Sequence, residues 1–373
     1  MRVPFLDLNA QYNEVKAAVD SSFAEILANS AYVLGKYNKE LEQRIAERHQ
    51  VKHAIAVNSG TDALRIMMQA SGILPGDEVI TTAFTFVASV ETIAQIGAVP
   101  VFVDIDPQTY CIDPAKIEAA ITPKTKAILP IHLFGQLADM KAIKAIADKH
   151  NLLILEDAAQ ALFGHCDGVY TGEWGSASAI SFYVTKNLGA AGDGGMILTN
   201  DDEVARRSLS LRIHGMGRER YYYDEIGYTS RMAELQAAFL VAKLARVDAW
   251  NDRRVEVAEQ LLAGLANTGI GLPRTYEGNN NTWHQFTIRS DQRGALMEFL
   301  KSNEIDSGIY YPVPLHLHEP YAGFGRGEGS LPITERVSQE CLSLPVQAHL
   351  SNEQVEFMID KIQEFCRVSA GKA

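Results

Sequence analysis

Short apolar runs alternate with amphipathic stretches from about residue 54 to residue 200. The runs are bounded by turn residues such as those of 75–77 (PGD), whereas the stretches between them, for example 140–151, space their apolar residues as a helix does. Strands buried on both faces of a sheet are continuously apolar, as ILPI (128–131) is. The pattern predicts an α/β fold, with a mostly parallel, seven-stranded sheet between layers of helices. The expected strands cover residues 54–57, 78–82, 99–104, 126–131, 152–156, 178–183 and 196–199.

The pattern changes beyond about residue 231. A long helical pattern covers residues 232–265, and a loop rich in Gly, Pro and Asn follows at 272–281. One strand (282–288) and two helices (295–301 and 352–365) are expected after it. We expect a large α/β domain and a smaller α+β domain joined by the N-terminal arm. Their expected limits are 14–245 for the large domain, 246–373 for the small domain and 1–13 for the arm.

Composition and charge narrow the class of protein. The chain has 373 residues, of which 47% are apolar and 21% charged, as in a folded globular protein. Its net charge of −12 would repel a phosphate backbone, which disfavours nucleic acid as a partner. No run approaches the ~18 apolar residues of a membrane span, and we expect a cytoplasmic protein without a membrane partner. The four cysteines are far apart and predict neither a disulfide framework nor a metal site.

A small turn containing glycine follows the first expected strand. It reads NSGTD (58–62) and leads directly into a helical pattern. Free backbone N–H groups at a helix N-terminus, together with the hydroxyls of Ser59 and Thr61, suit an anion such as a phosphate. The alternative is an ordinary N-cap, in which Ser59 or Thr61 caps a core helix.

Two other expected strands end next to chemically active side chains. Asp157 lies at the carboxyl end of the strand 152–156, where ligands gather in open α/β sheets. A partly desolvated aspartate there can keep a proton on a heteroaromatic nitrogen, and a helix cap is the alternative. Lys186 follows the strand 178–183 and can act as an amine nucleophile toward an aldehyde. A solvated surface lysine is the alternative for this position.

These three segments together suit one cofactor. Pyridoxal phosphate needs a phosphate cradle, a carboxylate for its pyridine nitrogen and a lysine that forms a Schiff base with it. Phe84 and Phe86 follow the strand 78–82, and one of the two rings could stack on the cofactor while the other packs in the core. The sequence therefore predicts a pyridoxal phosphate site at the carboxyl edge of the sheet.

Longer motifs resemble the DegT/DnrJ/EryC1/StrS family of pyridoxal-phosphate-dependent nucleotide-sugar aminotransferases over nearly the whole chain. The most specific resemblance is EDAAQA (156–161) followed about thirty residues later by TKNLG (185–189). It implies the aspartate aminotransferase-like fold (fold type I), with the smaller α+β domain at the C-terminal end. The other similar segments are NSGTDAL (58–64), TTAFTFVAS (81–89), HLFGQLADM (132–140), RIHGMG (212–217), SRMAELQAA (230–238) and YYPVPLHLHEPY (310–321).

The resemblance implies roles for individual residues. Lys186 would form the Schiff base and move the proton between the substrate carbon and the cofactor. Asp157 would pair with the pyridinium nitrogen, and Gln160 would reach the ring hydroxyl. The remaining cofactor contacts that the resemblance implies are Gly60, Thr61 and Ser181 to the phosphate, and Phe86, or else Phe84, stacked on the ring.

The resemblance also implies a homodimer, or a larger assembly of dimers, in which each site receives residues from the neighbouring subunit. The family segment that usually reads Gly-aromatic-Asn-x-Arg is GYTSR (227–231) here. Thr229 therefore stands where an asparagine would reach across to the phosphate, and its side chain is shorter. Val184 replaces a common proline and Ile213 a frequent asparagine before His214, and neither change touches the reacting groups.

The activity that the resemblance implies is transfer of an amino group, typically from glutamate, to a nucleotide-linked keto sugar in aminodeoxy-sugar biosynthesis. The opening VPFLDLNAQYNEVK (3–16) resembles the branch that acts on 3-keto sugars, and a dTDP-linked 3-keto-6-deoxyhexose is the first prediction. A UDP-linked 3-keto sugar of the N-acetylhexosaminuronate type, a 4-keto sugar, and a regulatory or binding protein without catalysis stay open. Surface loop histidines are the alternative for His316 and His318. The candidate substrate contacts are His316, Tyr311, Tyr310, Arg231 and His214, with Trp283 and His284 as further candidates.

Overall fold

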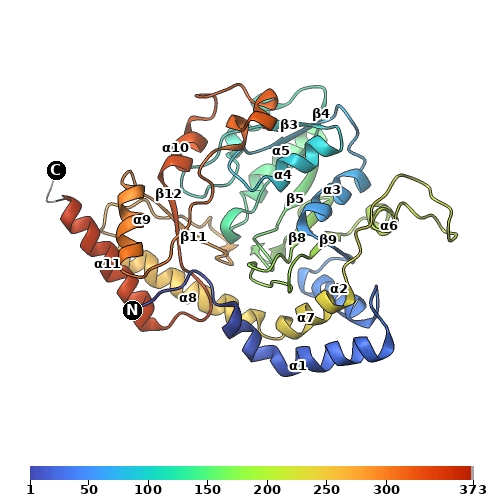
Figure 1. Cartoon of the computed structure of the whole chain (residues 1–373). Coiled ribbons are helices and arrows are strands. Elements are labelled where there is room, and N and C mark those ends of the chain that lie inside the picture. Colours follow the sequence, from blue (N-terminus) through green and yellow to red (C-terminus); the bar gives the residue numbers. More distant parts are fainter. Residues whose placement is uncertain (371–373) are drawn as a thin grey trace.

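A seven-stranded sheet organises the larger part of the computed structural model, which describes residues 1–370 (Figure 1). The strand order is β1-β9-β8-β5-β4-β2-β3. Strand β9 pairs antiparallel with β1 and β8, and the other neighbours pair parallel. The predicted mostly parallel, seven-stranded sheet is therefore confirmed. The strands are β1 (His53–Val57), β2 (Glu78–Thr81), β3 (Val99–Phe102), β4 (Thr125–Ile128), β5 (Leu153–Asp157), β8 (Ala177–Ser181) and β9 (Gly195–Thr199).

Helices cover both faces of this sheet. Alternate residues of a strand point to opposite faces, so Val79 and Leu155 pack in the core beneath α3, α4 and α6, whereas Ile80 and Ile154 pack beneath α5. Helices α2 and α7 cover the remaining strands on the second face. The helices are α2 (Lys36–His49), α3 (Gly60–Ala70), α4 (Ala88–Gln95), α5 (Met140–His150), α6 (Asp202–Leu211) and α7 (Glu234–Leu244).

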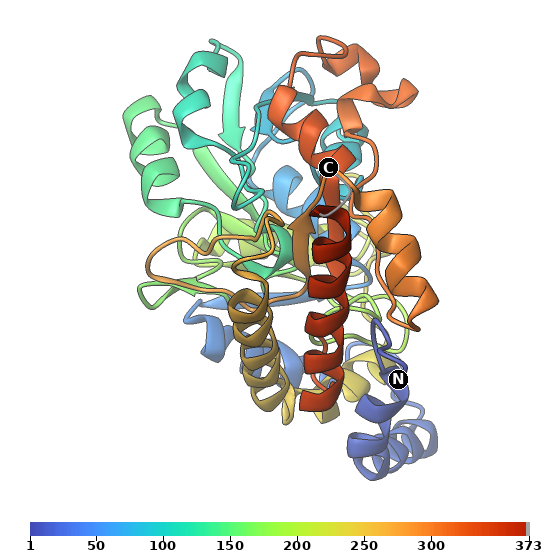
Figure 2. The same cartoon turned by 90° about the vertical axis from the view of Figure 1, so that its left-hand side faces the viewer.

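The C-terminal part of the chain forms a smaller α+β unit with a core of its own. The antiparallel pair of β11 (Phe286–Arg289) and β12 (Cys341–Leu344) lies against three helices, and Figure 2 shows two of them, α8 and α11, side by side. The arm before α1 (Leu8–Asn29) joins this unit, because Val3 is fully buried in its core and the Val3 N–H donates to the Glu304 carbonyl (2.9 Å). The helices of this unit are α8 (Val247–Leu265), α9 (Arg293–Ser302), α10 (Pro332–Glu340) and α11 (Asn352–Ala370).

The long helical pattern of 232–265 forms two helices, and the chain turns between α7 and α8. The Arg246 N–H donates to the Lys243 carbonyl (2.9 Å), three residues back, so the α-helical hydrogen-bond ladder is interrupted there. Buried residues continue at helical spacing on both sides, from Leu240 to Val247 and Trp250, and periodicity alone does not reveal the turn. The short elements are β6 (His165–Cys166), β7 (Val169–Tyr170), β10 (Asn279–Asn280), η1 (Pro114–Lys116), η2 (Glu118–Ala120), η3 (Leu133–Gly135), η4 (Leu315–Leu317) and η5 (Glu319–Phe324).

No helix within residues 1–370 combines the length and the apolar character that crossing a bilayer requires.

Candidate active site

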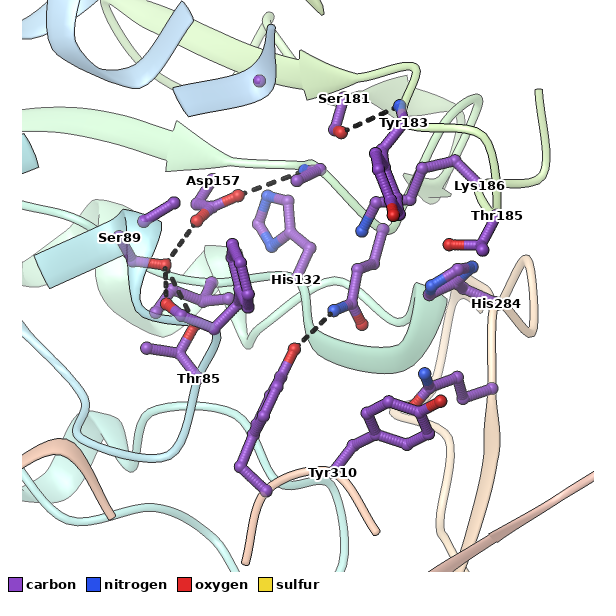
Figure 3. A pocket seen from close by; sticks show the side chains of 18 of the residues that line it. Thr85, Ser89, His132, Asp157, Ser181, Tyr183, Thr185, Lys186, His284 and Tyr310 are labelled. Carbon is purple, nitrogen blue, oxygen red and sulfur yellow. Dashed lines mark hydrogen bonds between the residues drawn. The ribbon is translucent and has the colours of Figure 1, made fainter. Parts of the chain in front are cut away.

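A cavity of about 540 Å³ lies where the carboxyl ends of β2, β4, β5 and β8 meet the small unit (Figure 3). Its volume falls within the range of ~300–1,000 Å³ that is usual for small-molecule sites. The sheet side contributes residues that follow directly on the strand ends, and the small unit closes the opposite side. The lining residues that matter below are Gly60, Thr61, Phe86, Ser89, His132, Asp157, Gln160, Ser181, Lys186, Arg254, His284, Tyr310 and Tyr311.

Asp157 lies at the end of β5 and is only 4% exposed. Its Oδ2 accepts a hydrogen bond from the Ser89 hydroxyl (2.7 Å), and its Oδ1 accepts from the Ala159 N–H (3.1 Å). Burial raises the pKa of Asp157, and these two hydrogen bonds and the charge of Lys186 only partly oppose the shift. A cationic group in the cavity would stabilise the carboxylate further.

Lys186 follows β8 and points into the same cavity (Figure 3). Burial lowers its pKa to about 8, and the nearby Asp157 carboxylate opposes this shift. No hydrogen bond within the described part of the chain involves its Nζ. The side chain is therefore an amine that is partly uncharged near neutral pH, and it faces the carboxylate across the cavity.

The N-terminus of α3 forms the third part of the site. The Ser59 hydroxyl accepts from the Asp62 N–H (3.1 Å), so Ser59 is the N-cap, as the alternative interpretation expects for it. The N–H groups of Gly60 and Thr61 find no acceptor among residues 1–370 and lie at the positive end of the helix. A Cβ at Gly60 would lie 2.7 Å from the Ser181 Cβ, so glycine lets the helix end approach Ser181.

Gln160 and Phe86 also line the cavity. Gln160 accepts from the Phe134 N–H at Oε1 (2.7 Å), and its Nε2 donates to the Tyr311 hydroxyl (3.4 Å). Phe86 is 55% exposed, and its ring lies 6.3 Å from the Tyr311 ring, centroid to centroid. Phe84, the other ring that the sequence leaves open, is fully buried in a separate core and does not line the cavity.

Several of the expected substrate contacts lie outside this cavity. His316 is fully buried, and its Nε2 lies 3.0 Å from Glu335 Oε1, so an internal partner occupies it. It is neither a surface histidine nor a residue of the cavity. Trp283 packs in the core of the small unit. Two other expected substrate contacts, Tyr310 and Tyr311, do line the cavity.

The segment 212–231 also lies away from the cavity of its own chain. In Figure 1 it extends beyond α6, on the side far from the small unit. The Thr229 hydroxyl and His214 Nε2 lie 3.1 Å apart, and both residues are exposed. Arg231, at the end of the segment, is half-buried and does not line the cavity.

Ser89, His132 and Arg254 also line the cavity, although none of them is among the residues expected from the sequence. Ser89 holds Asp157, and His132 lies between Asp157 and Lys186 in Figure 3. His132 Nδ1 accepts from the Ala138 N–H (3.2 Å), so its Nε2 carries the proton and donates to Glu156 (3.0 Å). Arg254 lies on the buried stripe of α8, and a charged residue at such a position was a signal that the sequence offered.

A family model matches residues 13–363 of this chain. The chain belongs to the DegT/DnrJ/EryC1/StrS aminotransferase family. This confirms the family that the sequence motifs indicate, and with it the expectation of an enzyme.

Curated proteins that are similar to this chain align with it over nearly their whole length. A protein of Geobacillus stearothermophilus called pleiotropic regulatory protein is 47% identical, covering 98% of this chain and 99% of its own. A dTDP-3-amino-3,4,6-trideoxy-alpha-D-glucose transaminase of Streptomyces venezuelae is 44% identical, covering 98% and 96%. A UDP-N-acetyl-3-dehydro-alpha-D-glucosamine 3-aminotransferase of Acidithiobacillus ferrooxidans is 40% identical, covering 95% of each.

The fold is also similar to that of a solved structure. The crystal structure of S. venezuelae DesV in complex with a ketimine intermediate matches with a TM-score of 0.95 at 43% sequence identity, covering 98% of each chain. The predicted fold type is therefore confirmed.

Proposed function

We propose that this protein is a pyridoxal-phosphate-dependent aminotransferase that moves the amino group of an amino acid, with glutamate as the expected donor, to the keto carbon of a nucleotide-linked sugar. The observation that carries the proposal is the convergence of the Lys186 amine, the buried Asp157 carboxylate and the free N–H groups of α3 on one cavity. The overall reaction converts an amino acid and a keto sugar into a keto acid and an amino sugar.

The residues of the cavity fit this cofactor. The unpaired N–H groups at the α3 N-terminus and the Ser181 hydroxyl match a phosphate. The Asp157 carboxylate, buried without a cationic partner within 4.0 Å in the described chain, matches a protonated ring nitrogen. The exposed Phe86 ring matches an aromatic face. When bound, pyridoxal phosphate carries the amino group and spreads the negative charge that develops on the substrate carbon.

Different side chains of the protein would then move the proton, hold the cofactor and border the substrate. Lys186 Nζ, uncharged above a pKa of about 8, would take the proton from the reacting carbon of the donor and return a proton to the sugar carbon. Asp157 would hold the cofactor in its electron-accepting form, and Ser89 would fix the direction of that carboxylate. Gln160, anchored by the Phe134 N–H, would orient the ring from its side. Tyr310 and Tyr311 would border the sugar.

A dTDP-linked 3-keto-6-deoxyhexose is the proposed acceptor. The similarity to the S. venezuelae transaminase over nearly the whole chain supports it, as does the N-terminal segment 3–16. A UDP-linked 3-keto sugar is the alternative, which the Acidithiobacillus relative favours, and a 4-keto sugar stays a further alternative.

A second copy of this chain is the proposed partner. The segment 212–231 carries four large side chains that are each more than half exposed, and it holds Thr229 and His214 away from the cavity of its own chain. Burial of such a patch against another copy would bring the two residues toward the neighbouring site. These side chains are Tyr221, Tyr222, Tyr223 and Ile226, which are 67%, 68%, 55% and 91% exposed.

The experiment incubates the purified protein with pyridoxal phosphate, L-glutamate and one candidate nucleotide keto sugar at a time, and detects amino sugar by mass spectrometry. We expect amino sugar with one of these substrates for the wild type and none for Lys186→Ala. A protein that retains the cofactor but aminates no sugar would instead favour the regulatory or binding alternative, to which the name of the Geobacillus relative corresponds.

A further inference from the structure

A buried arginine without an anionic partner lines the cavity on the side of the small unit. Arg254 belongs to α8, is 3% exposed and faces the cavity together with His284. Burial lowers its pKa to about 10, and no acidic neighbour opposes that shift. Burying an unpaired guanidinium is unfavourable, so a ligand that brings a negative charge into the cavity would be stabilised by it.

Only part of the hydrogen-bonding capacity of Arg254 is used by the protein. A guanidinium has five N–H groups. The Nη1 of Arg254 donates to the carbonyls of Trp283 (3.1 Å), His284 (3.4 Å) and Val346 (3.2 Å). Its Nε and Nη2 donate to no residue in the part of the chain that the structure describes, and neither is among the fully buried atoms that lack a partner. The free edge of Nε and Nη2 is the fork that binds both oxygens of a carboxylate side-on.

Hydrogen bonds join the segment of Lys186 to α8, the helix that carries Arg254, and to His284. Asn187, the next residue after Lys186, donates to Asn251 of α8 (2.9 Å), and its Oδ1 lies 3.1 Å from His284 Nδ1. Because the Asn187 amide nitrogen is the donor in its other contacts, Oδ1 accepts and His284 Nδ1 donates. Burial lowers the pKa of His284 well below its ordinary value, so this imidazole is neutral. Among the residues that line the cavity in the described part of the chain, Lys186 and Arg254 are the only lysine and arginine, so Arg254 is the cation available to an anionic substrate group.

We propose that Arg254 binds the α-carboxylate of the amino-acid donor, and of the keto acid formed from it, through Nε and Nη2. The inference rests on the proposed function, because it assigns an anchor to one of its two substrates. In an α-amino acid the carboxylate is one bond from the carbon that reacts, so the group that binds it must line the cavity that Lys186 lines, as Arg254 does. In a nucleotide-linked 3-keto sugar the diphosphate is several bonds from the reacting carbon. Arg254 would therefore contribute to binding of the amino-acid donor and not to binding of the nucleotide sugar.

The test compares Arg254→Gln and Arg254→Lys with Arg253→Gln as the matched control. Arg253 precedes Arg254 in α8 and also donates to a backbone carbonyl, that of Leu350 (2.9 Å), but it does not line the cavity. Each protein, loaded with pyridoxal phosphate, is titrated by calorimetry with 2-oxoglutarate, which cannot react with the cofactor in that form, and with dTDP. Thermal unfolding of each variant shows whether the loss of the Nη1 contacts affects folding.

Loss of a charge-assisted pair predicts a dissociation constant for 2-oxoglutarate that rises about 10- to 100-fold in Arg254→Gln. It should stay near the wild-type value in Arg253→Gln, with an intermediate value in Arg254→Lys and unchanged dTDP binding in all three. Equal 2-oxoglutarate binding by wild type and Arg254→Gln would overturn the inference, and so would a loss confined to dTDP, which would assign the arginine to the diphosphate. If Arg254→Gln does not fold, absence of 2-oxoglutarate binding to the wild type is the result that overturns it. Failure of the proposed function is a separate result, namely absence of amino transfer by the wild type whatever these titrations show.

Discussion

Replacing Asp157 by asparagine should affect activity and stability in opposite directions. The amide keeps the size of the carboxylate and both hydrogen bonds, since its oxygen can accept from the Ala159 N–H and its NH₂ group can donate to the Ser89 hydroxyl. What Asp157→Asn removes is a buried charge that has no cationic partner in the protein without cofactor. Activity should fall, whereas the free energy of unfolding of the apoprotein should not.

The size of the activity loss follows from the charge pair that Asp157 would form with a protonated ring nitrogen. Two unit charges about 4 Å apart interact by about 4 kcal/mol at an effective dielectric constant near 20. Loss of that amount from the transition state slows the reaction about 10³-fold. Single-turnover kinetics with L-glutamate, followed by the change in cofactor absorbance, measure this effect. Ser89→Ala keeps the charge and loses one hydrogen bond, so its effect should be about tenfold.

The pH dependence of stability gives the second measurement. Burial raises the pKa of Asp157 above its ordinary value of 3.8, so the folded apoprotein holds this proton more tightly than the unfolded chain does. The wild-type apoprotein therefore loses stability as the pH rises from about 4 through the raised pKa of Asp157, because the carboxyl group becomes charged while buried. Asp157→Asn does not lose this stability, because an amide does not ionise. The difference in melting temperature, variant minus wild type, should grow in the positive direction from pH 4 upward.

Asp104→Asn is the control. Asp104 is also buried, but it accepts from the N–H groups of Ile333 (3.0 Å) and Thr334 (2.8 Å) and lies 3.6 Å from Lys116. Its substitution should lower stability and leave amino transfer intact. An Asp157→Asn apoprotein that unfolds more easily than wild type at pH 7 while transfer continues at the wild-type rate would refute the assignment of Asp157.

Three other predictions concern the remaining parts of the site. The rate at which the apoprotein binds pyridoxal phosphate covalently should rise about tenfold per pH unit up to about pH 8 and then level off, because burial lowers the pKa of Lys186 to about 8; a rise that continues to pH 10 in stopped-flow absorbance would contradict this. Gly60→Ala should weaken cofactor binding roughly tenfold by titration, because its Cβ would lie 2.7 Å from Ser181 Cβ, whereas Gly294→Ala, with open space around its Cβ, should not. His316→Asn should lower the free energy of unfolding, measured in urea, by about 1–3 kcal/mol without changing the KM for the sugar. A raised KM would instead indicate that His316 contacts the substrate.

The strands were predictable because they fall in short apolar runs bounded by turn residues, and the strand ends then located Asp157 and Lys186. Contacts between distant segments were less accessible. Nothing near His316 in the sequence shows that Glu335 will bind it in a buried pair. Likewise, no local pattern distinguishes Phe84 from Phe86, although the fold buries the first ring and exposes the second.

Arg254 is a different case, because the sequence did carry a signal for it. It falls at the spacing of Trp250, Val257 and Leu261, all of which are buried on the same stripe of α8. A charged residue in such a stripe needs a partner, and the partner can be a ligand. The turn between α7 and α8 lacked any comparable signal, since buried residues keep helical spacing across it.

The most direct test of the account is to reduce the protein with borohydride in the presence of pyridoxal phosphate and map the modified peptide by mass spectrometry. We predict that the reduced cofactor is attached to Lys186, that a visible absorbance band disappears on reduction, and that Lys186→Ala shows neither. Attachment to another lysine with Lys186 unmodified, or the same band in Lys186→Ala, would contradict it.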